Sequence, residues 1–216
     1  MKTIALYISL LLCVFTTLNA AETVKKEERN LASFSSIHAG SAFVVYLSQG
    51  SDQQVVVETE EKYVGKIETT VKNGTLYVGL KDLQGRNNHD LKTLHVYVTI
   101  PDIKNIAVSS AVKVKVQTPI KSNGSVSIKL SGASTLDDFT LDCKGFRLEL
   151  SGASKSDVNL TCDNADIDLS GASHLKIGGK VGILNMNASG ASKIDTRNLT
   201  YDKGDMHTSG TSRIRR

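Results

Sequence analysis

Tryptophan is absent from this 216-residue chain, and only two prolines are present. No stretch of ten residues in the repeat region described below carries the apolar period of an amphipathic helix, which argues against an α-helical or α/β fold. Val, Ile, Thr, Ser and Gly are abundant instead, as is typical of all-β proteins. We therefore expect an all-β fold of one or two domains.

Catalytic and cofactor motifs are absent as well. The sequence contains no G-x-S-x-G, no Walker-type loop and no G-x-G-x-x-G after a predicted strand. Its five histidines form neither an H-E-x-x-H motif nor a Cys/His set with zinc spacing. We therefore expect no enzyme activity, no cofactor and no metal. The net charge of +4 is modest and spread along the chain, so we expect no nucleic acid partner.

The first 21 residues have the pattern of a secretory signal peptide. Lys2 precedes an apolar run over residues 4–18, and small residues end the segment at Ala20 and Ala21. This predicts an exported protein (periplasmic, cell-surface or extracellular) with no transmembrane segment in the mature chain. Cys13 follows Leu12 rather than a small residue, so lipidation of this cysteine is the less favoured alternative. Residues 22–30 are rich in charge and predict a mobile leader ahead of the fold.

A Ser-Gly-Ala-Ser string recurs through the last 90 residues. Copies start at Ser131, Ser151, Ser170 and Ser189, and a near-copy starts at Ser209, with spacings of 20, 19, 19 and 20 residues. Alternating apolar and polar residues flank each copy, as in Ile128-Lys129-Leu130, which is typical of half-buried strands. A coil of this length cannot bury its own apolar face, so coils must stack. The sequence thus predicts a right-handed β-helix, or β-solenoid, with coils of about 20 residues over residues 101–216.

The tetrapeptide itself is best explained as a corner of the coil. Its glycines would permit positive φ or a close approach of neighbouring backbones. We expect the alanines to point inward at a narrow vertex and the serines to bond to backbone groups. A ligand-binding role for the repeated string is the alternative. The predicted structural corner consists of Gly132, Gly152, Gly171, Gly190 and Gly210.

Residues 31–100 predict either a separate N-terminal β region or the first irregular coils. Strand-like alternation occurs over residues 43–47, 55–58 and 94–100, and Asn73-Gly74 indicates a two-residue hairpin loop. Residues 106–112 read as a degenerate repeat with Ser110 in the place of glycine. The earlier segment is expected to cap the solenoid, whose open end would otherwise be an exposed sheet edge.

Two cysteines of the predicted mature chain, Cys143 and Cys162, lie one coil apart. Stacking would bring their α-carbons to about 4.8 Å, which is within disulfide range. A disulfide is therefore possible in an exported protein. Two buried thiols are the slightly favoured alternative, because in-register neighbours on parallel strands have unsuitable side-chain directions.

Two columns of charge follow the tetrapeptide. Lys155, His174, Lys193 and Arg213 would form a basic stripe, which serves either solubility or the attraction of an acidic glycan, lipopolysaccharide or other anionic surface. The second column is read as a mixed-sign charge ladder, with ion or glycan binding and glycoside hydrolysis as alternatives. Its members are Asp137, Asp138, Asp157, Lys176, Asp195 and Arg215.

The order of motifs resembles a known family. Residues 34–50 carry Phe34-x-x-Ile37-x-x-Gly40-Ser-x-Phe43-x-Val45-x-Leu47-x-Gln49-Gly50, and the Asn73-Gly74 hairpin, Pro101-x-Ile103-x-x-Ile106 and the Ser-Gly-Ala-Ser series follow. This succession resembles the putative auto-transporter adhesin, head GIN domain family of exported Bacteroidetes proteins, over residues 31–216. The resemblance implies a right-handed β-helix with an adhesin role and supplies no catalytic residue.

These observations favour an exported, non-enzymatic β-helix protein that acts in adhesion or binds a cell-surface glycan or envelope protein. A polysaccharide-binding or polysaccharide-cleaving β-helix is the rival function. The short loops of the repeat region argue against cleavage, because they offer little material for a cleft. A third possibility is an assembly module that forms homo-oligomers through its coil ends.

Overall fold

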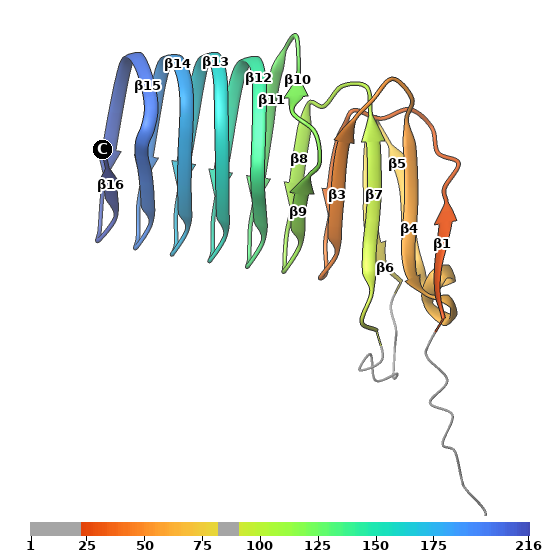
Figure 1. Cartoon of the computed structure of the whole chain (residues 1–216). Coiled ribbons are helices and arrows are strands. Elements are labelled where there is room, and N and C mark those ends of the chain that lie inside the picture. The colour runs from red at the N-terminus through yellow and green to blue at the C-terminus, as the bar shows by residue number, and fades with distance from the viewer. Residues whose placement is uncertain (1–22, 82–90) are drawn as a thin grey trace, which may run out of the picture.

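The structure is a computed structural model that describes residues 23–81 and 91–216, and it is almost entirely β (Figure 1). The predicted signal peptide and Cys13 lie outside the described residues. The described elements are β1 (Val24–Glu28), β2 (Ser36–Ala39), β3 (Val44–Gln49), β4 (Gln54–Glu60), the 3-10 helix η1 (Glu61–Lys66), β5 (Ile67–Lys72), β6 (Thr75–Leu80), β7 (Leu94–Ile100), β8 (Asn105–Val108), β9 (Lys113–Val116), β10 (Ile120–Lys121), β11 (Ser125–Leu130), β12 (Thr135–Leu150), β13 (Lys155–Leu169), β14 (His174–Ala188), β15 (Lys193–Thr208) and β16 (Arg213–Arg215).

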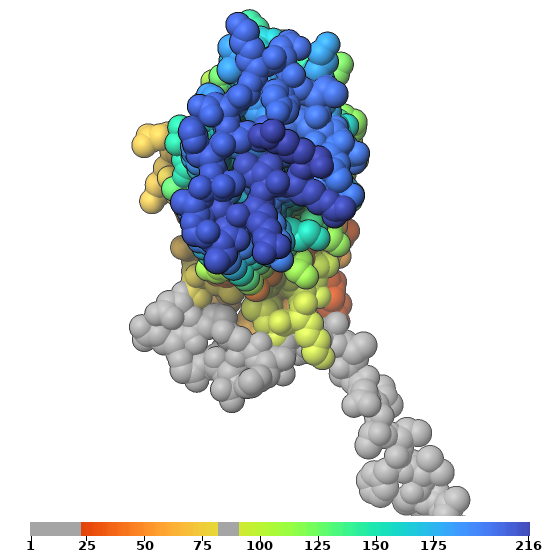
Figure 2. Space-filling model, turned by 90° about the vertical axis from the view of Figure 1, so that its left-hand side faces the viewer, coloured from red at the N-terminus to blue at the C-terminus, as the bar shows by residue number. Residues whose placement is uncertain are grey.

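The repeats stack as parallel coils, which confirms the predicted β-solenoid. Strands β12, β13, β14 and β15 pair in parallel along almost their whole length. Leu148, Ile167, Met186 and Met206 form one such column across four coils. In these four coils, most of the residues form one long strand that bends (Figure 1). Viewed from the C-terminal end, the last coil covers most of the coils behind it, so the coils stack with little offset (Figure 2).

The period-2 alternation of the sequence builds the core. In β12, alternate residues such as Leu136, Leu141 and Leu148 are at most 1% exposed, and the residues between them face outward. The inward side chains of both halves of each coil join a single hydrophobic cluster. Polar outward positions therefore form continuous columns along the solenoid, one residue per coil.

Coils begin earlier in the chain than residue 101. Strands β2 and β3 pair in parallel with β8 and β9, so residues 36–49 form a coil of the stack. Ser41 and Ser110 have φ of 65° and 69°, and Ala111 N donates to Ser41 O just as Ala133 N donates to Ser110 O. Residues 31–100 therefore contribute both a coil, over residues 36–49, and antiparallel strand pairs.

Antiparallel strands cover the N-terminal end. β4 pairs with β7 and β5 pairs with β6, the latter through the predicted hairpin, in which Asn73 and Gly74 have φ of 50° and 70°. The charged segment expected to be a mobile leader also belongs here, which corrects that prediction. Val24–Glu28 form β1, antiparallel to β4, because their backbone groups complete an otherwise open edge.

Two β-bulges explain the unequal repeat lengths. The register between β12 and β13 shifts between Leu136 and Phe139, and Asp138 there has φ of 56°. A second shift occurs where β15 pairs with β14, between Asp195 and Asn198. Each bulge lies in a coil of 20 residues, whereas the 19-residue coils pair without such a shift. The extra residue is thus absorbed inside a strand, and the columns after it stay aligned.

Candidate functional site

The five corner glycines stand in a column at positive φ. Their φ angles lie between 68° and 71°. A Cβ atom on Gly152 would lie 2.7 Å from the backbone oxygen of Gly132, and one on Gly171 would lie 2.6 Å from that of Gly152. Side chains at this column would collide with the coil before them, so geometry accounts for the repeated glycine.

Inside the tetrapeptide, the serine and not the alanine points into the core. Ala133, Ala153, Ala172 and Ala191 are exposed, which corrects the expectation that they point inward. Four of the last serines, those at 134, 154, 173 and 192, are 0% exposed. The left-handed glycine turns the chain so that the residue two positions later faces inward. Each of these hydroxyls donates to the carbonyl oxygen three residues before it, at 2.6–2.8 Å, which satisfies both groups without a ligand.

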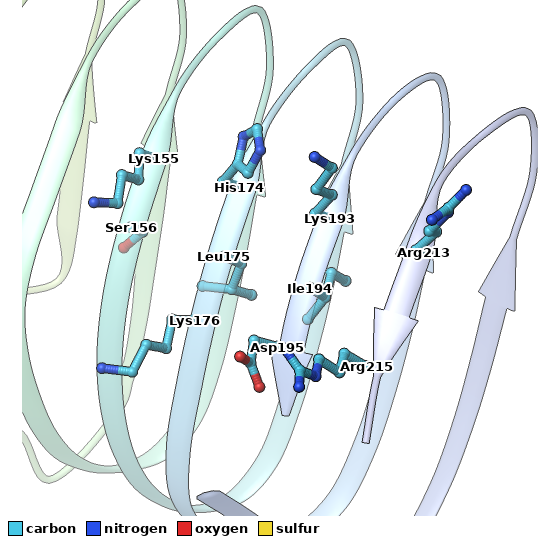
Figure 3. A pocket seen from close by; sticks show the side chains of 10 residues that line it. All are labelled: Lys155, Ser156, His174, Leu175, Lys176, Lys193, Ile194, Asp195, Arg213 and Arg215. Carbon is cyan, nitrogen blue, oxygen red and sulfur yellow. The ribbon is translucent and has the colours of Figure 1, made fainter. Parts of the chain in front are cut away.

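Directly after the corner, the predicted basic residues lie side by side. Lys155 pairs with His174, His174 with Lys193, and Lys193 with Arg213, and all four side chains are exposed. We call these four residues the basic row. The parallel register fixes them on consecutive strands, about 4.8 Å apart. Figure 3 shows them in line across β13, β14, β15 and β16.

A shallow groove of about 380 Å³ runs beside the basic row. Two residues further along each strand, Lys176, Asp195 and Arg215 form its other side. Ser156, Leu175 and Ile194 lie between the two sides. These three side chains are buried, so their backbone forms the floor. We call this feature the basic groove.

The cations of the basic row are uncompensated. Within the described part of the chain, the side chains of Lys155, Lys193 and Arg213 have neither a hydrogen bond nor an ion pair. The His174 Nδ1 atom lies 3.1 Å from the carbonyl oxygen of Ala172. Three permanent positive charges thus project into solvent from one edge of the groove, where an anion would meet no competing carboxylate.

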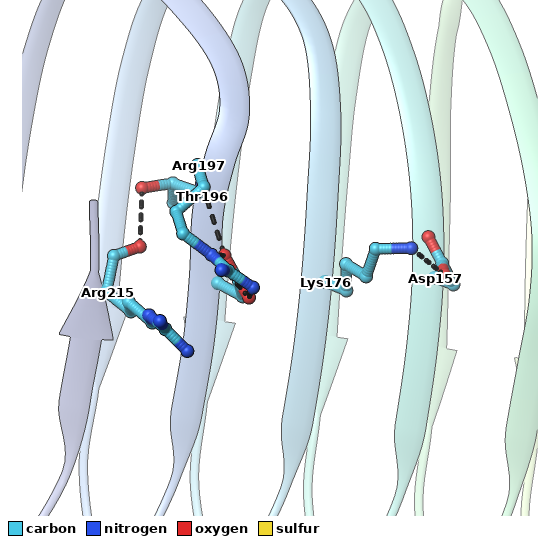
Figure 4. Close-up of polar contacts among 6 residues, drawn as sticks. Asp157, Lys176, Thr196, Arg197 and Arg215 are labelled. Atoms are coloured by element: carbon cyan, nitrogen blue, oxygen red, sulfur yellow. Dashed lines mark hydrogen bonds and ion pairs between the residues drawn. The ribbon is translucent and has the colours of Figure 1, made fainter.

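On the opposite side of the groove, Lys176 and Asp195 are paired with neighbouring side chains, whereas the Arg215 guanidinium has no hydrogen bond or ion pair among the described residues (Figure 4). Lys176 Nζ lies 2.8 Å from Asp157 Oδ2 on the coil before it, and this contact raises the pKa of Lys176. Arg197, placed by the bulge, bonds to Asp195 at 2.6 Å and holds the pKa of that carboxyl at about 2. Thr196 Oγ1 donates to the carbonyl oxygen of Arg215 at 3.0 Å.

The second column therefore has mixed sign, as a charge ladder would. Asp137 pairs with Lys115, Asp157 with Lys176, and Asp195 with Arg215. Asp138 lies at the bulge. A glycoside hydrolase needs one carboxyl with a raised pKa to act as general acid. The pKa of Asp195 is lowered instead, so this carboxyl is poorly suited to act as that acid.

Cys143 and Cys162 lie opposite each other in register, as their spacing predicts. Both are buried free thiols in the structure, and each Sγ lies 3.2 Å from the carbonyl oxygen two residues later, that of Gly145 and Asn164. The hydrogen bond to Cys143, together with burial, raises the pKa of the Cys162 thiol.

Sequence reasoning missed two features of the same outer sheet face. Lys113 of β9 lies in the same column as the basic row, two strands before Lys155, with Thr135 between them. Further along, Tyr46 and Tyr97 stack with ring centroids 4.7 Å apart, and Tyr97 donates a 2.5 Å hydrogen bond to Glu58. Periodicity could have found Lys113. The tyrosine pair joins residues 51 positions apart and left no local signal.

A family of known proteins matches this chain over most of its length. A family model described as "Putative auto-transporter adhesin, head GIN domain" matches residues 33–215. The chain belongs to this family. The resemblance inferred from the sequence is thus confirmed, and the matched residues include the coils and the basic groove.

Solved structures agree in fold. A putative adhesin from Bacteroides fragilis superposes with a TM-score of 0.67 at 14% identity, covering 90% of this head GIN chain and 97% of the other. A putative lipid binding protein from Parabacteroides distasonis gives 0.61 at 15% identity, with 89% and 96% covered. A putative adhesin from the same species gives 0.65 at 14% identity, with 87% and 96% covered. At these identities the likeness concerns the fold alone. No curated protein sequence matches this chain.

Residues 23–81 and 91–216 contain no helix that is long and apolar enough to cross a membrane. The same part of the chain contains no group of three or more His, Cys, Asp or Glu side chains that could hold a metal ion.

Proposed function

We propose that this protein is an exported, non-enzymatic adhesin-type protein that binds an anionic partner at the cell surface or envelope through the basic groove. The observation that carries the proposal is the basic row, in which Lys155, Lys193 and Arg213 have no counter-charge among the described residues. Uncompensated cations on a rigid sheet raise the local concentration of anions and bind them without first breaking an ion pair.

Membership of an adhesin-type family supports binding rather than catalysis. The carboxylates nearest the groove, Asp157 and Asp195, are held in ion pairs and are poorly suited to acid–base chemistry. Export is supported by the signal-peptide pattern of residues 1–21. N-terminal sequencing of the protein from its native host should give a mature chain that starts after Ala20 or Ala21, in an extracytoplasmic fraction.

Retention on immobilised heparin at low salt tests the binding role. The triple variant Lys155→Ser, Lys193→Ser, Arg213→Ser is expected to elute at clearly lower salt than the native protein. A matched control removes three exposed lysines away from the groove, Lys121, Lys144 and Lys180, and should elute between the two. Retention that is unchanged in the groove variant, or equally reduced in both variants, would contradict a role for the basic row.

Glycan cleavage is the rival activity. The native protein is tested for cleavage of acidic and neutral glycans. Cleavage that is lost when Asp137 and Asp157 are changed to Asn would show that the protein acts as an enzyme. Sedimentation of the mature chain at high concentration tests the assembly role, since a strict monomer would argue against it.

A further inference from the structure

The basic row continues beyond the groove. Lys113 is exposed and occupies the same column on β9, and it too has no side-chain hydrogen bond or ion pair with the described residues. From Lys113 to Arg213 the column crosses six strands in register. At about 4.8 Å per strand, its length is about 24 Å.

The residues of this row are held at fixed spacing along a single line. Backbone hydrogen bonds fix the spacing, and both 20-residue coils absorb their extra residue in a bulge located after the row. The cations therefore repeat along a straight line parallel to the solenoid axis. A compact anion placed on the line reaches only two or three of them, whereas an extended chain of anions meets them all.

The neighbouring column limits what can lie on this face. It carries Asp137, Asp157 and Asp195 beside the lysines and arginine. The charges of the two signs offset each other in this column, so a flat anionic surface that covers both columns gains little net attraction from the second one. A narrow chain that follows the basic row keeps its charges beside the uncompensated cations.

Aromatic side chains distinguish between narrow polyanions. Proteins that bind single-stranded nucleic acids stack bases on exposed aromatic faces. The basic groove is lined by no Phe, Tyr or Trp. On the same sheet face, Tyr46 has Tyr97 on one side of its ring and Lys115 Nζ at 5.5 Å from its centroid. Its partner Tyr97 is flanked by Lys26 Nζ at 4.7 Å, so both rings are already engaged.

We propose that the ligand of the basic groove is a linear acidic polysaccharide, carrying sulfate or carboxylate groups along its length, that lies parallel to the solenoid axis from Lys113 to Arg213. This inference rests on the proposed anion-binding function and adds the shape and class of the ligand. The polymer contributes regularly repeated charge, and the row contributes a matching line of cations.

Titration calorimetry with size-fractionated heparin and oligogalacturonate, from disaccharide to hexadecasaccharide, tests the inference on the mature chain. Affinity should rise with length until the oligosaccharide spans about 24 Å and then level off. Inositol hexakisphosphate serves as the compact polyanion and should bind at least tenfold more weakly than the longest oligosaccharide. A charge-matched single-stranded oligonucleotide and vesicles of anionic phospholipid should also bind more weakly.

The variant Lys113→Ser, Lys155→Ser, Lys193→Ser, Arg213→Ser should lose at least tenfold in affinity for the long oligosaccharides. The control Lys72→Ser, Lys121→Ser, Lys144→Ser, Lys180→Ser has the same net charge, and its affinity should fall less than threefold. Circular dichroism establishes that both variants fold.

The outcomes separate this inference from the proposed function. One outcome is that the compact polyanion binds as tightly as the longest oligosaccharide, with both depending on the basic row. In that case anion binding by the groove is supported, and the proposal of a linear polymer as the ligand is wrong. If the oligonucleotide or the vesicles bind more tightly than any oligosaccharide, the polysaccharide class is wrong. If no anion binds through the row, both proposals fail.

Discussion

Gly132 and Gly152 are stacked so closely that a Cβ on Gly152 would lie 2.7 Å from the backbone oxygen of Gly132. The close approach recurs at every coil from Gly132 onward, and it allows the corners to stack backbone on backbone. Gly74 has nearly the same φ, 70° against 71°, but no atom lies within 4 Å of its virtual Cβ. The two glycines therefore separate the effect of backbone conformation from that of crowding.

Replacing each glycine by alanine should reveal this difference. Gly74→Ala is expected to destabilise the fold by about 1–2 kcal/mol, the cost of a left-handed conformation for a residue with a Cβ. Gly152→Ala adds a collision with backbone and should cost at least about 2 kcal/mol more. Urea unfolding followed by circular dichroism measures both. If the two variants lose the same free energy of unfolding, the backbone around Gly152 can move to accommodate a Cβ atom without further cost.

Two buried serines of the same coil provide a second matched pair. Ser154 donates to Ser151 O at 2.8 Å, whereas the hydroxyl of Ser156 has no partner among the described residues. Ser154→Ala should therefore cost about 1 kcal/mol, and Ser156→Ala should be neutral or stabilising by up to about 1 kcal/mol. Chemical denaturation distinguishes the two. A clear loss in Ser156→Ala would point to a hydrogen bond that the structure does not contain.

The pair formed by Glu58 and Tyr97 should make stability depend on pH at both ends of the range. The Tyr97 hydroxyl, followed by His95 and Lys26, lowers the pKa of Glu58, and the carboxylate in turn raises the pKa of Tyr97 to about 12. A lowered carboxyl pKa stabilises the fold above the unfolded value and is lost as the pH falls through the folded one. For the raised tyrosine pKa, the stabilisation is complete below about pH 10 and is lost as the pH rises toward 12.

Tyr97→Phe should accordingly cost about 1–2 kcal/mol at pH 7, since a hydrogen bond to a charged group is removed. The difference from the native protein should shrink below about pH 4 and above about pH 11. Equilibrium unfolding at several pH values gives this profile. A difference that stays constant from pH 3 to pH 9 would show that the carboxylate is not the partner that matters.

For the cysteines we expect two thiols and no disulfide. Neighbours in register on parallel strands have Cβ atoms about 4.8 Å apart, outside the usual 3.5–4.5 Å of a disulfide. Burial should make both thiols slow to react with Ellman's reagent in the native protein, and denaturation without reductant should release two. If denatured protein gives none, Cys143 and Cys162 are bonded and the coil distorts to allow it.

The sequence predicted the fold well because the coil repeats itself. Lys155, His174, Lys193 and Arg213 each follow a copy or near-copy of the tetrapeptide at the same distance. The repeat alone therefore predicted that these four residues form a column. Where the motif decays, prediction failed. Residues 40–43 read Gly-Ser-Ala-Phe, with Ser41 in the glycine place and Phe43 in the place of the buried serine, so the sequence left open whether this segment is a coil or a separate β region.

Other misses have local causes. Alanine is apolar and was assigned inward, but the left-handed residue before it reverses the expected alternation. Strand β1 is charged, and only its antiparallel pairing with β4 makes it a strand. The bulge at Asp138 was detectable, because a 20-residue coil among 19-residue coils must place one residue outside the regular ladder.

Because neighbouring coils have nearly equal length and spacing, the solenoid can be lengthened by inserting whole coils. Residues 151–169 and 170–188 are interchangeable units of the same length, each adding one member to every column. Duplicating residues 151–169, which carry Lys155, should extend the basic row by one charge and about 4.8 Å while leaving both ends of the molecule untouched. The number of coils would then set the reach of the protein along whatever polymer it holds.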